Sequence, residues 1–394
     1  MKALRRMPRI ERGRHVPPLS LRRPDDSGAG GQILVLFALG LLVMVAGVAL
    51  IVDGGNAYAQ QRSVQNGADA AANAGADVLA LKLAGLTKSD TDVKNAIVSN
   101  SGLNAVTATA YYTNVTGQPI DASGNVSTAS LAAQVGNSNP IPPNAQGVHV
   151  SGNRAFGTTF GKAIGFGNLT ASAEAIAIAG KVIGGKFMPV VFPVNITDCS
   201  GNGSLGVGKD QWPVSQPGVP PAHPVGQEYI VPLCKTGGGS FMVLNLDGKP
   251  NNCAEEVTNP KPVQFVSFPV DVASDNGNNC ATPLADAVNA MSGGDTVLIP
   301  ICDDNACNTS GGSNATYHVT GVVAFYIDYM EDSNNQNDSL CQTHTNATGA
   351  TLVTLSGNGS SSCIAGWFVR FITAGPVGAG PIGNADAIGI QLIK

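Results

Sequence analysis

Aromatic and charged residues are scarce in this sequence of 394 residues. Aromatic residues make up 5% and charged residues 12%, whereas there are 49 glycines and 24 prolines. A compact, helix-rich cytosolic enzyme is disfavoured by that balance, because glycine and proline interrupt helices. The composition is typical of loop-rich β structure with many turns.

Charge is absent from one long stretch, Ile33–Val52. Its twenty consecutive residues include no charged or polar side chain and no proline. As a helix rising 1.5 Å per residue, the stretch covers roughly 30 Å, the thickness of a bilayer's hydrocarbon core. It therefore predicts one transmembrane helix. The alternative is a signal peptide cleaved near Ala46–Ala49. The apolar region of a signal peptide is typically only about 7 to 15 residues long, which is shorter than this stretch.

Acidic residues are few before this stretch, and that predicts its orientation. Three acids, Glu11, Asp25 and Asp26, accompany eight bases: Lys2, Arg5, Arg6, Arg9, Arg12, Arg14, Arg22 and Arg23. Basic flanks stay on the cytoplasmic side, so the N-terminus is expected inside the cell and the remainder outside it. Of 22 bases and 27 acids, 14 and 24 remain in that outer part, a net charge of −10. Nucleic acid is therefore not expected as a partner.

Cysteine is absent from the first 198 residues. All eight cysteines lie in the distal half: Cys199, Cys234, Cys253, Cys280, Cys302, Cys307, Cys341 and Cys363. An even number confined to the expected outside predicts up to four disulfides, with the connectivity left open. The alternative is a zinc site using pairs such as Cys302 with Cys307 or Cys341 with His344, although neither pair forms a CxxC frame.

The segment after the apolar stretch is rich in alanine and free of proline. Small and apolar residues recur every three or four positions, which predicts one helical face: Val64, Ala68, Ala71, Gly75, Leu79 and Leu83. Such a face can pack on partner subunits or on its own domain. Gly54–Gly55 is a candidate break between the two helical segments.

The stretch from residue 30 to residue 76 resembles the N-terminal domain of TadE/TadG-like Tad (tight adherence, Flp) pilus-assembly proteins. The resemblance depends on residues that enter, close and follow the apolar run: Gly31, Gln32, Asp53, Tyr58, Arg62, Gln65 and Asp69. It implies a component anchored in the cytoplasmic membrane that acts by helix packing, with these seven residues at interfaces or at the membrane boundary. Prepilin processing at Gly31 needs glutamate five residues later, where this chain has Leu36. The N-terminus is therefore expected to be kept.

Strand patterns fill the rest of the chain. Alternating stretches at 105–113, 147–152 and 169–180 resemble the pilin-like remainder of the family. Beyond a boundary at 181–186, seven further strand candidates separated by turn residues predict a mainly-β sandwich or barrel: 188–196, 228–233, 240–246, 262–272, 295–302, 317–330 and 366–374.

Catalytic motifs are missing. The run Asn202–Gly206 resembles a nucleophile elbow but has asparagine where the first glycine belongs. No catalytic residue and no cofactor is predicted. Three Asp/Asn-rich segments are candidate calcium-binding loops, because they supply oxygen ligands: Asp275–Asn279, Asp303–Asn305 and Glu331–Asp338. The alternative is that they are solvated turns.

Together these patterns predict a membrane-anchored α+β protein. Its expected parts are a basic cytoplasmic tail (1–31), a transmembrane helix (32–53) continuing into an amphipathic helix with pilin-like strands (54–180), and a disulfide-stabilised mainly-β domain (187–394). The expected role is structural, in a Tad-type pilus or its assembly machinery, with other pilus-assembly or pilin-like subunits as partners. Two alternatives are a surface adhesive or glycan-binding module with an unknown ligand and an anchored envelope hydrolase.

Overall fold

The computed structural model describes most of the chain after the basic tail. The described residues are 29–193, 229–233, 243–250, 252–275, 277–291, 296–302, 316–331, 344–345, 351–352, 362–380, 382–383 and 386–394. Several predictions fall outside them: the tail up to residue 28, Asn202–Gly206, Asp303–Asn305, Asp332–Asp338, and Cys199, Cys234, Cys307 and Cys341.

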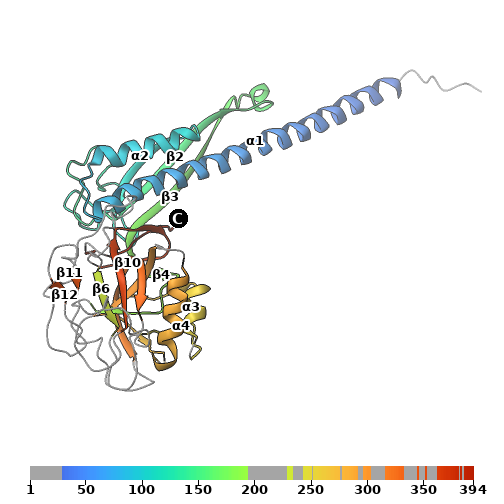
Figure 1. Ribbon diagram of the computed structural model, residues 1–394. Helices are drawn as coiled ribbons and strands as arrows, with labels where there is room; N and C mark the ends of the chain where they lie inside the picture. Colours follow the sequence, from blue (N-terminus) through green and yellow to red (C-terminus); the bar gives the residue numbers. More distant parts are fainter. Residues whose placement is uncertain are drawn as a thin grey trace, which may run out of the picture. The chain divides into compact units, whose positions relative to one another are not determined.

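The chain divides into two compact units. The first contains residues 1–56 with Thr158–Gly167, and the second contains Ala57–Gly157 with Asn168–Lys394. Helix α1 (Ala29–Leu83) is continuous through both (Figure 1). The expected break at Gly54–Gly55 is therefore wrong. Each glycine costs a helix about 1 kcal/mol, which the long helical segments on both sides offset.

The first part of α1 is long and apolar enough to cross a membrane. The membrane-crossing candidate within α1 reaches a mean hydropathy of 3.0, and no residue of its most apolar window is buried by the chain itself. The apolar side chains of Ile33–Val52 therefore face the surroundings, as a lipid-facing helix requires.

A six-stranded sheet in the second unit contains the strands expected at 105–113, 147–152 and 169–180, and their likeness to a pilin stays a prediction. Its order is β1 (Thr107–Thr113), β2 (Gly147–Gly157), β3 (Asn168–Val182), β16 (Ile388–Leu392) and β14 (Ile372–Ala374), with β15 (Val377–Gly378) also pairing with β3. All pairs are antiparallel except β14 with β16. The short 3-10 helix η1 (Gly161–Ile164) lies in the connection between β2 and β3.

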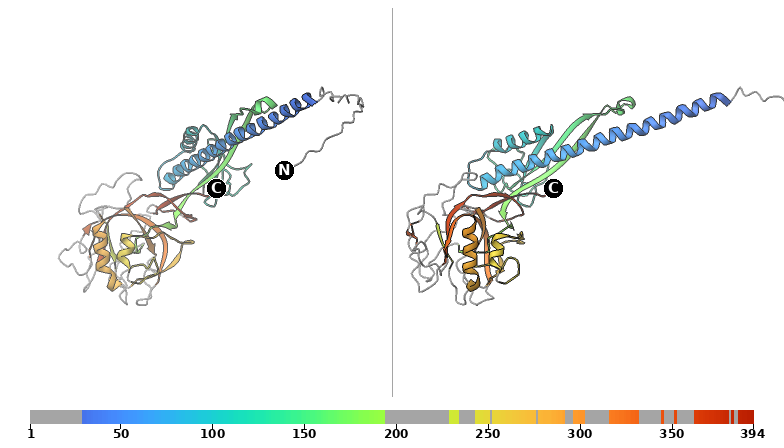
Figure 2. Two further views of the ribbon diagram at one scale, coloured as in Figure 1. Left: turned by 90° about the vertical axis from the view of Figure 1, so that its right-hand side faces the viewer. Right: turned by 45° about the vertical axis from the view of Figure 1, so that its right-hand side comes forward.

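The C-terminal half of α1 packs along this sheet (Figure 2). The predicted small-residue face forms the contact, because Val64, Ala68, Ala71 and Leu79 are fully buried in a core shared with β2 and β3. Glycines allow the close approach. A Cβ atom added at Gly75 would lie 2.9 Å from Cγ2 of Val148. This segment of α1 is therefore a core helix of its own domain.

A second helix, α2 (Asp90–Leu103), covers the same core. Ser89 caps its N-terminus, and the side chains of Ser89 and Asp92 form a reciprocal capping box. Val93 and Ile97, four residues apart, are buried against α1 and the sheet. The sequence analysis did not predict this helix.

A second six-stranded sheet forms the distal part of the same unit. Its order is β5 (Phe192–Pro193), β9 (Thr296–Cys302), β10 (Thr316–Glu331), β13 (Ser362–Val369) and β6 (Tyr229–Leu233), with β8 (Val270–Ala273) pairing with β10. Two short two-stranded pairs are β11 (His344–Thr345) with β12 (Thr351–Leu352) and β4 (Gly184–Gly185) with β7 (Val263–Gln264).

The distal half also contains helices α3 (Cys253–Thr258) and α4 (Gly277–Ala290), where only strands were expected. Cys280, Leu284 and Val288 recur every four residues and are buried, so α4 packs one side into the core despite containing a proline. Within the stretches predicted at 188–196 and 240–246, the described residues form only β5 and isolated bridges.

The two sheets are joined by contacts near the C-terminus. The backbone N–H of Ala387 donates to the carbonyl of Val322 in β10, and the Lys181 ammonium lies 3.3 Å from the Asp386 carboxylate. Strands from the C-terminal segment thus complete the sheet of β1–β3. The boundary at 181–186 stays a prediction.

Candidate interface along the first helix

Asp53 is the first residue after the apolar run, and it holds the connection between β2 and β3. Its carboxylate accepts three consecutive backbone N–H groups, from Thr159 at 2.7 Å, Phe160 at 3.0 Å and Gly161 at 2.7 Å. These donors begin η1, where backbone N–H groups have no partner within the helix. Asp53 was predicted as a boundary residue, but nothing in the sequence links it to residues more than a hundred positions away.

Glutamines hold α1 to the exposed edge of β3. The amide of Gln61 donates to the carbonyl of Ser172 at 2.7 Å. The amide of Gln65 donates both to Oδ1 of Asp69 at 2.7 Å and to the carbonyl of Glu174 at 3.2 Å. Gln65 and Asp69, two predicted interface residues, are therefore brought together by the fold and bind within their own chain.

Tyr58 and Arg62 lie one helical turn apart on α1 and contact each other. The Arg62 guanidinium carbon is 5.9 Å from the centre of the exposed Tyr58 ring, a cation–π distance. Gly31 and Gln32 lie in the first turns of α1. These positions do not test whether the four residues contact other subunits, so that role stays a prediction.

A cluster of titratable groups that sequence reasoning missed lies on the sheet. Glu174 on β3 accepts a hydrogen bond from the Lys394 ammonium and lies 3.5 Å from Nε2 of His149, whose ring stacks on Tyr111 at 4.6 Å. The Lys394 hydrogen bond lowers the pKa of Glu174, while burial lowers the pKa of His149. The carboxylate is thus held ionised beside a neutral imidazole at pH 7. Glu174, Lys394 and Gln65 line an open cleft of about 520 Å³.

The predicted partner-binding face of α1 is covered by the chain itself. Val64, Ala68, Ala71 and Leu79 have no exposed surface, and Gly75 is buried as well. The expectation that this face contacts partner subunits is thereby corrected, because sheet and α2 side chains already occupy it. The surface of α1 left open consists of the apolar run and the polar side that bears Arg62, Asn73 and Asp77.

The distal half contains a disulfide between Cys253 and Cys280, which joins the starts of α3 and α4. Cys302 is disulfide-bonded as well, and Cys363 lies on β13. Cys253, Cys280 and Asp275 place one ligand atom each within 4.8 Å of one another, the kind of group that holds a metal ion. With the two sulfurs bonded to each other, neither is a free thiolate, the form that zinc requires.

Asp275 was expected in a calcium-binding or solvated loop, and it is instead buried. Its carboxylate accepts a hydrogen bond from the backbone N–H of Asn252 at 3.3 Å and lies next to the sulfur of Cys253. Calcium binding by the acidic segments stays a prediction.

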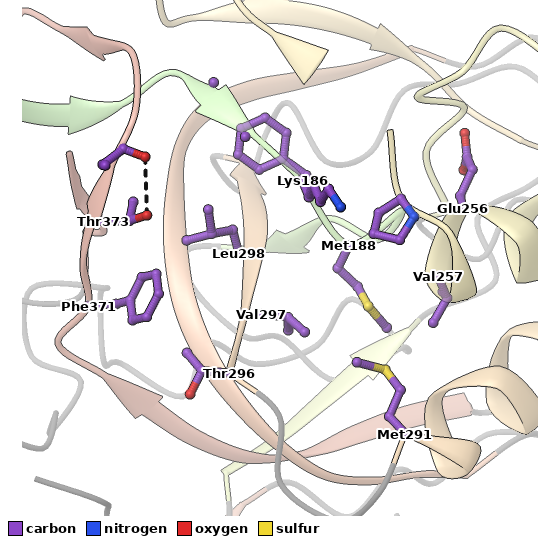
Figure 3. Close-up of a pocket in the computed structure, with 15 residues that line it drawn as sticks. Lys186, Met188, Glu256, Val257, Met291, Thr296, Val297, Leu298, Phe371 and Thr373 are labelled. Carbon is purple, nitrogen blue, oxygen red and sulfur yellow. Dashed lines mark hydrogen bonds between the residues drawn. The ribbon is translucent and has the colours of Figure 1, made fainter. Parts of the chain in front are cut away.

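A cavity of about 480 Å³ lies between α3, β9 and β14 (Figure 3). Its lining is mostly apolar, and Met188 and Met291 point toward each other across it (Figure 3). Glu256 lies at one edge, and its Oε1 accepts the backbone N–H groups of Leu246 and Asp247 at 2.8 and 2.7 Å. Burial raises the pKa of Glu256 to about 7, and its Oε2 has no hydrogen-bond partner among the described residues.

Comparison with protein families gives a match to the N-terminal segment. Residues 31–78 match the family described as putative Flp pilus-assembly TadE/G-like. The match covers the apolar run and most of the packed part of α1, including all seven predicted interface residues. Comparison with curated proteins and with solved structures finds no match.

Proposed function

We propose that this chain is a structural component of a Flp pilus or its assembly machinery, anchored in the cytoplasmic membrane by α1. The match of residues 31–78 to the pilus-assembly family carries this proposal. In it, Ile33–Val52 spans the bilayer, the basic tail stays in the cytoplasm and both sheets lie outside. The same match favours assembly over the adhesive and hydrolase alternatives.

The open surface of the apolar run supports packing against other membrane helices. Gly40 and Gly47 lie seven residues apart, so they share one side of the helix, and no atom lies within 4 Å of a Cβ added at either position. Membrane helices associate through such small residues because their backbones can approach closely there. In the proposal, this glycine side of α1 contacts the transmembrane helices of partner subunits.

The proposal is tested in a bacterium that builds Flp pili with this chain. Gly40→Leu and Gly47→Leu fill the proposed contact, whereas Ala46→Leu adds the same kind of bulk on another side of the helix. We expect the two glycine variants to lose surface pili, counted by electron microscopy, while their amount in the membrane fraction is unchanged and Ala46→Leu assembles pili normally.

Two results would contradict the proposal. One is a chain that sodium carbonate extracts from the membrane fraction, since a spanning helix resists this treatment. The other is a full count of pili when the chain is deleted. Equal defects in all three leucine variants would instead contradict the glycine contact alone.

A further inference from the structure

We infer that the β2–β3 connection, Thr158–Gly167, is a second membrane contact whose aromatic side chains enter the headgroup region of the bilayer beside the end of the span. The inference rests on the proposed anchoring of α1. It adds a lipid-binding surface from a distant part of the sequence, outside the segment that matches the pilus-assembly family.

The position of this loop follows from Asp53. Asp53 comes directly after Val52, the last residue of the apolar run, and its carboxylate binds the backbone N–H groups of residues 159 to 161 at 2.7 to 3.0 Å. A group within hydrogen-bond distance of the end of a span lies at the depth where hydrocarbon gives way to headgroups. The loop therefore meets the membrane boundary whenever α1 spans the bilayer.

The loop presents apolar side chains at that depth. Phe166 is 64% exposed and Phe160 is 37% exposed, although burial is the usual state of phenylalanine. Lys162, between them, is also exposed. Aromatic rings at the interface, with a basic side chain to reach lipid phosphates, are the pattern of segments that lie in the plane of a membrane surface.

The exposure of these rings is built into an ordered loop. The hydroxyl of Thr158 donates to the carbonyl of Phe166, and the N–H of Phe166 donates to the carbonyl of Gly161 at 2.9 Å. Gly165 supplies the left-handed turn with a φ of 92°. Because the backbone is hydrogen-bonded internally, the phenylalanines are presented outward by a defined turn, and lipid is the occupant that suits rings at this depth.

The test uses the full chain in proteoliposomes that contain phosphatidylcholine brominated at either a shallow or a deep acyl position. Tryptophan replaces one residue at a time: Phe160→Trp, Phe166→Trp, Met44→Trp within the span, and Val126→Trp on an exposed loop of the second unit. Met44 and Val126 are 73% and 61% exposed, which matches them in accessibility to Phe166, at 64%. The signal of the native tryptophans is subtracted with the parent chain.

We expect Phe166→Trp and Phe160→Trp to be quenched at least twofold more by shallow than by deep bromines, Met44→Trp to show the reverse, and Val126→Trp to show no quenching. In an Asp53→Ala background the quenching at position 166 should fall at least twofold while that at position 44 is unchanged. Quenching at 44 with none at 160 or 166 would overturn the lipid contact alone. No quenching at 44 would overturn the anchored topology and this inference with it.

Discussion

The glycines of α1 allow a prediction in which two identical substitutions have opposite effects on stability. Replacing glycine by alanine inside a helix stabilises it by about 0.5–1 kcal/mol when the added methyl group has space. At Gly55 no atom lies within 4 Å of the new Cβ. We therefore expect Gly55→Ala to raise the free energy of unfolding by that amount.

At Gly75 the same methyl group meets a closed core. It would lie 2.9 Å from Cγ2 of Val148 and 3.0 Å from Cδ1 and Cγ1 of Ile97, both of which are buried. Overpacking of this kind costs about 1–3 kcal/mol, more than the helix-propensity gain. Gly75→Ala should therefore lower the free energy of unfolding by up to about 2 kcal/mol, the difference between these terms.

Urea unfolding of the full chain in detergent, followed by circular dichroism, measures both effects. Gly102→Ala in α2 serves as a second open-space control outside the apolar run. Shortening Ile97 to valine removes its Cδ1 atom, so the cost of Ile97→Val should be smaller in the Gly75→Ala background than alone. If Gly75→Ala stabilises the chain as much as Gly102→Ala, the close packing of α1 on β2 and α2 is refuted.

Three further predictions concern the buried polar groups and the disulfide. Because burial raises the pKa of Glu256 from 4.5 to about 7, its ionisation should lower stability as the pH rises through that interval, by at most about 3 kcal/mol. The Tm of Glu256→Gln should therefore be higher than that of the parent at pH 8 and equal to it at pH 4. A difference in Tm that stays constant with pH would contradict the raised pKa of Glu256. Asp90 accepts hydrogen bonds from the Tyr112 hydroxyl and two backbone N–H groups, so Asp90→Ala should cost about 3 kcal/mol by urea unfolding, and a loss below about 1 kcal/mol would contradict it. Replacing Cys253 and Cys280 together by serine opens a loop with a sequence separation of 27 and should cost about 3 kcal/mol by the same measurement, whereas equal urea midpoints for the variant and the parent would show that the pair is not bonded.

The sequence predicted those elements whose periodicity is undisturbed. The apolar run, the face from Val64 to Leu79 and the alternating strands at 147–152 and 169–180 all appear where expected. The strands are longer than predicted because residues 147–157 of β2 pair with residues 168–178 of β3. Pairing extends a strand past the point where its own alternation stops, and a single sequence does not contain the partner's register.

The missed helices had weaker or hidden signals. The start of α2 was readable, since Ser89 and Asp92 form a capping box ahead of the apolar pair Val93 and Ile97. Helix α4 was hidden because it begins in a Gly/Asn-rich run that is typical of turns and contains Pro283. Its buried face depends on tertiary packing and on the disulfide at Cys280, neither of which local propensity reports.

The sequence predicted which residues belong to the candidate site, but it did not predict their hydrogen-bond partners. Asp53, Gln65 and Asp69 could be selected from their positions in the segment that matches the pilus-assembly family. Asp69 binds Gln65 one helical turn away, but the backbone partners of Asp53 and Gln65, residues 159–161 and Glu174, are more than a hundred positions away in the chain. Backbone groups carry no residue signature, so no pattern in the sequence could have identified them.

The burial of the small-residue face limits where partner subunits can bind. A helix side with no exposed surface cannot contact another chain without unpacking the core of its own domain, and the six-stranded sheet and α2 cover that side here. Beyond the apolar run, the exposed residues of α1 are mostly polar, and Tyr58 and Arg62 have the largest side chains among them. Polar surface gives orientation and selectivity more readily than affinity. If α1 acts by packing against partner helices, most of the binding energy must therefore come from the apolar run Ile33–Val52.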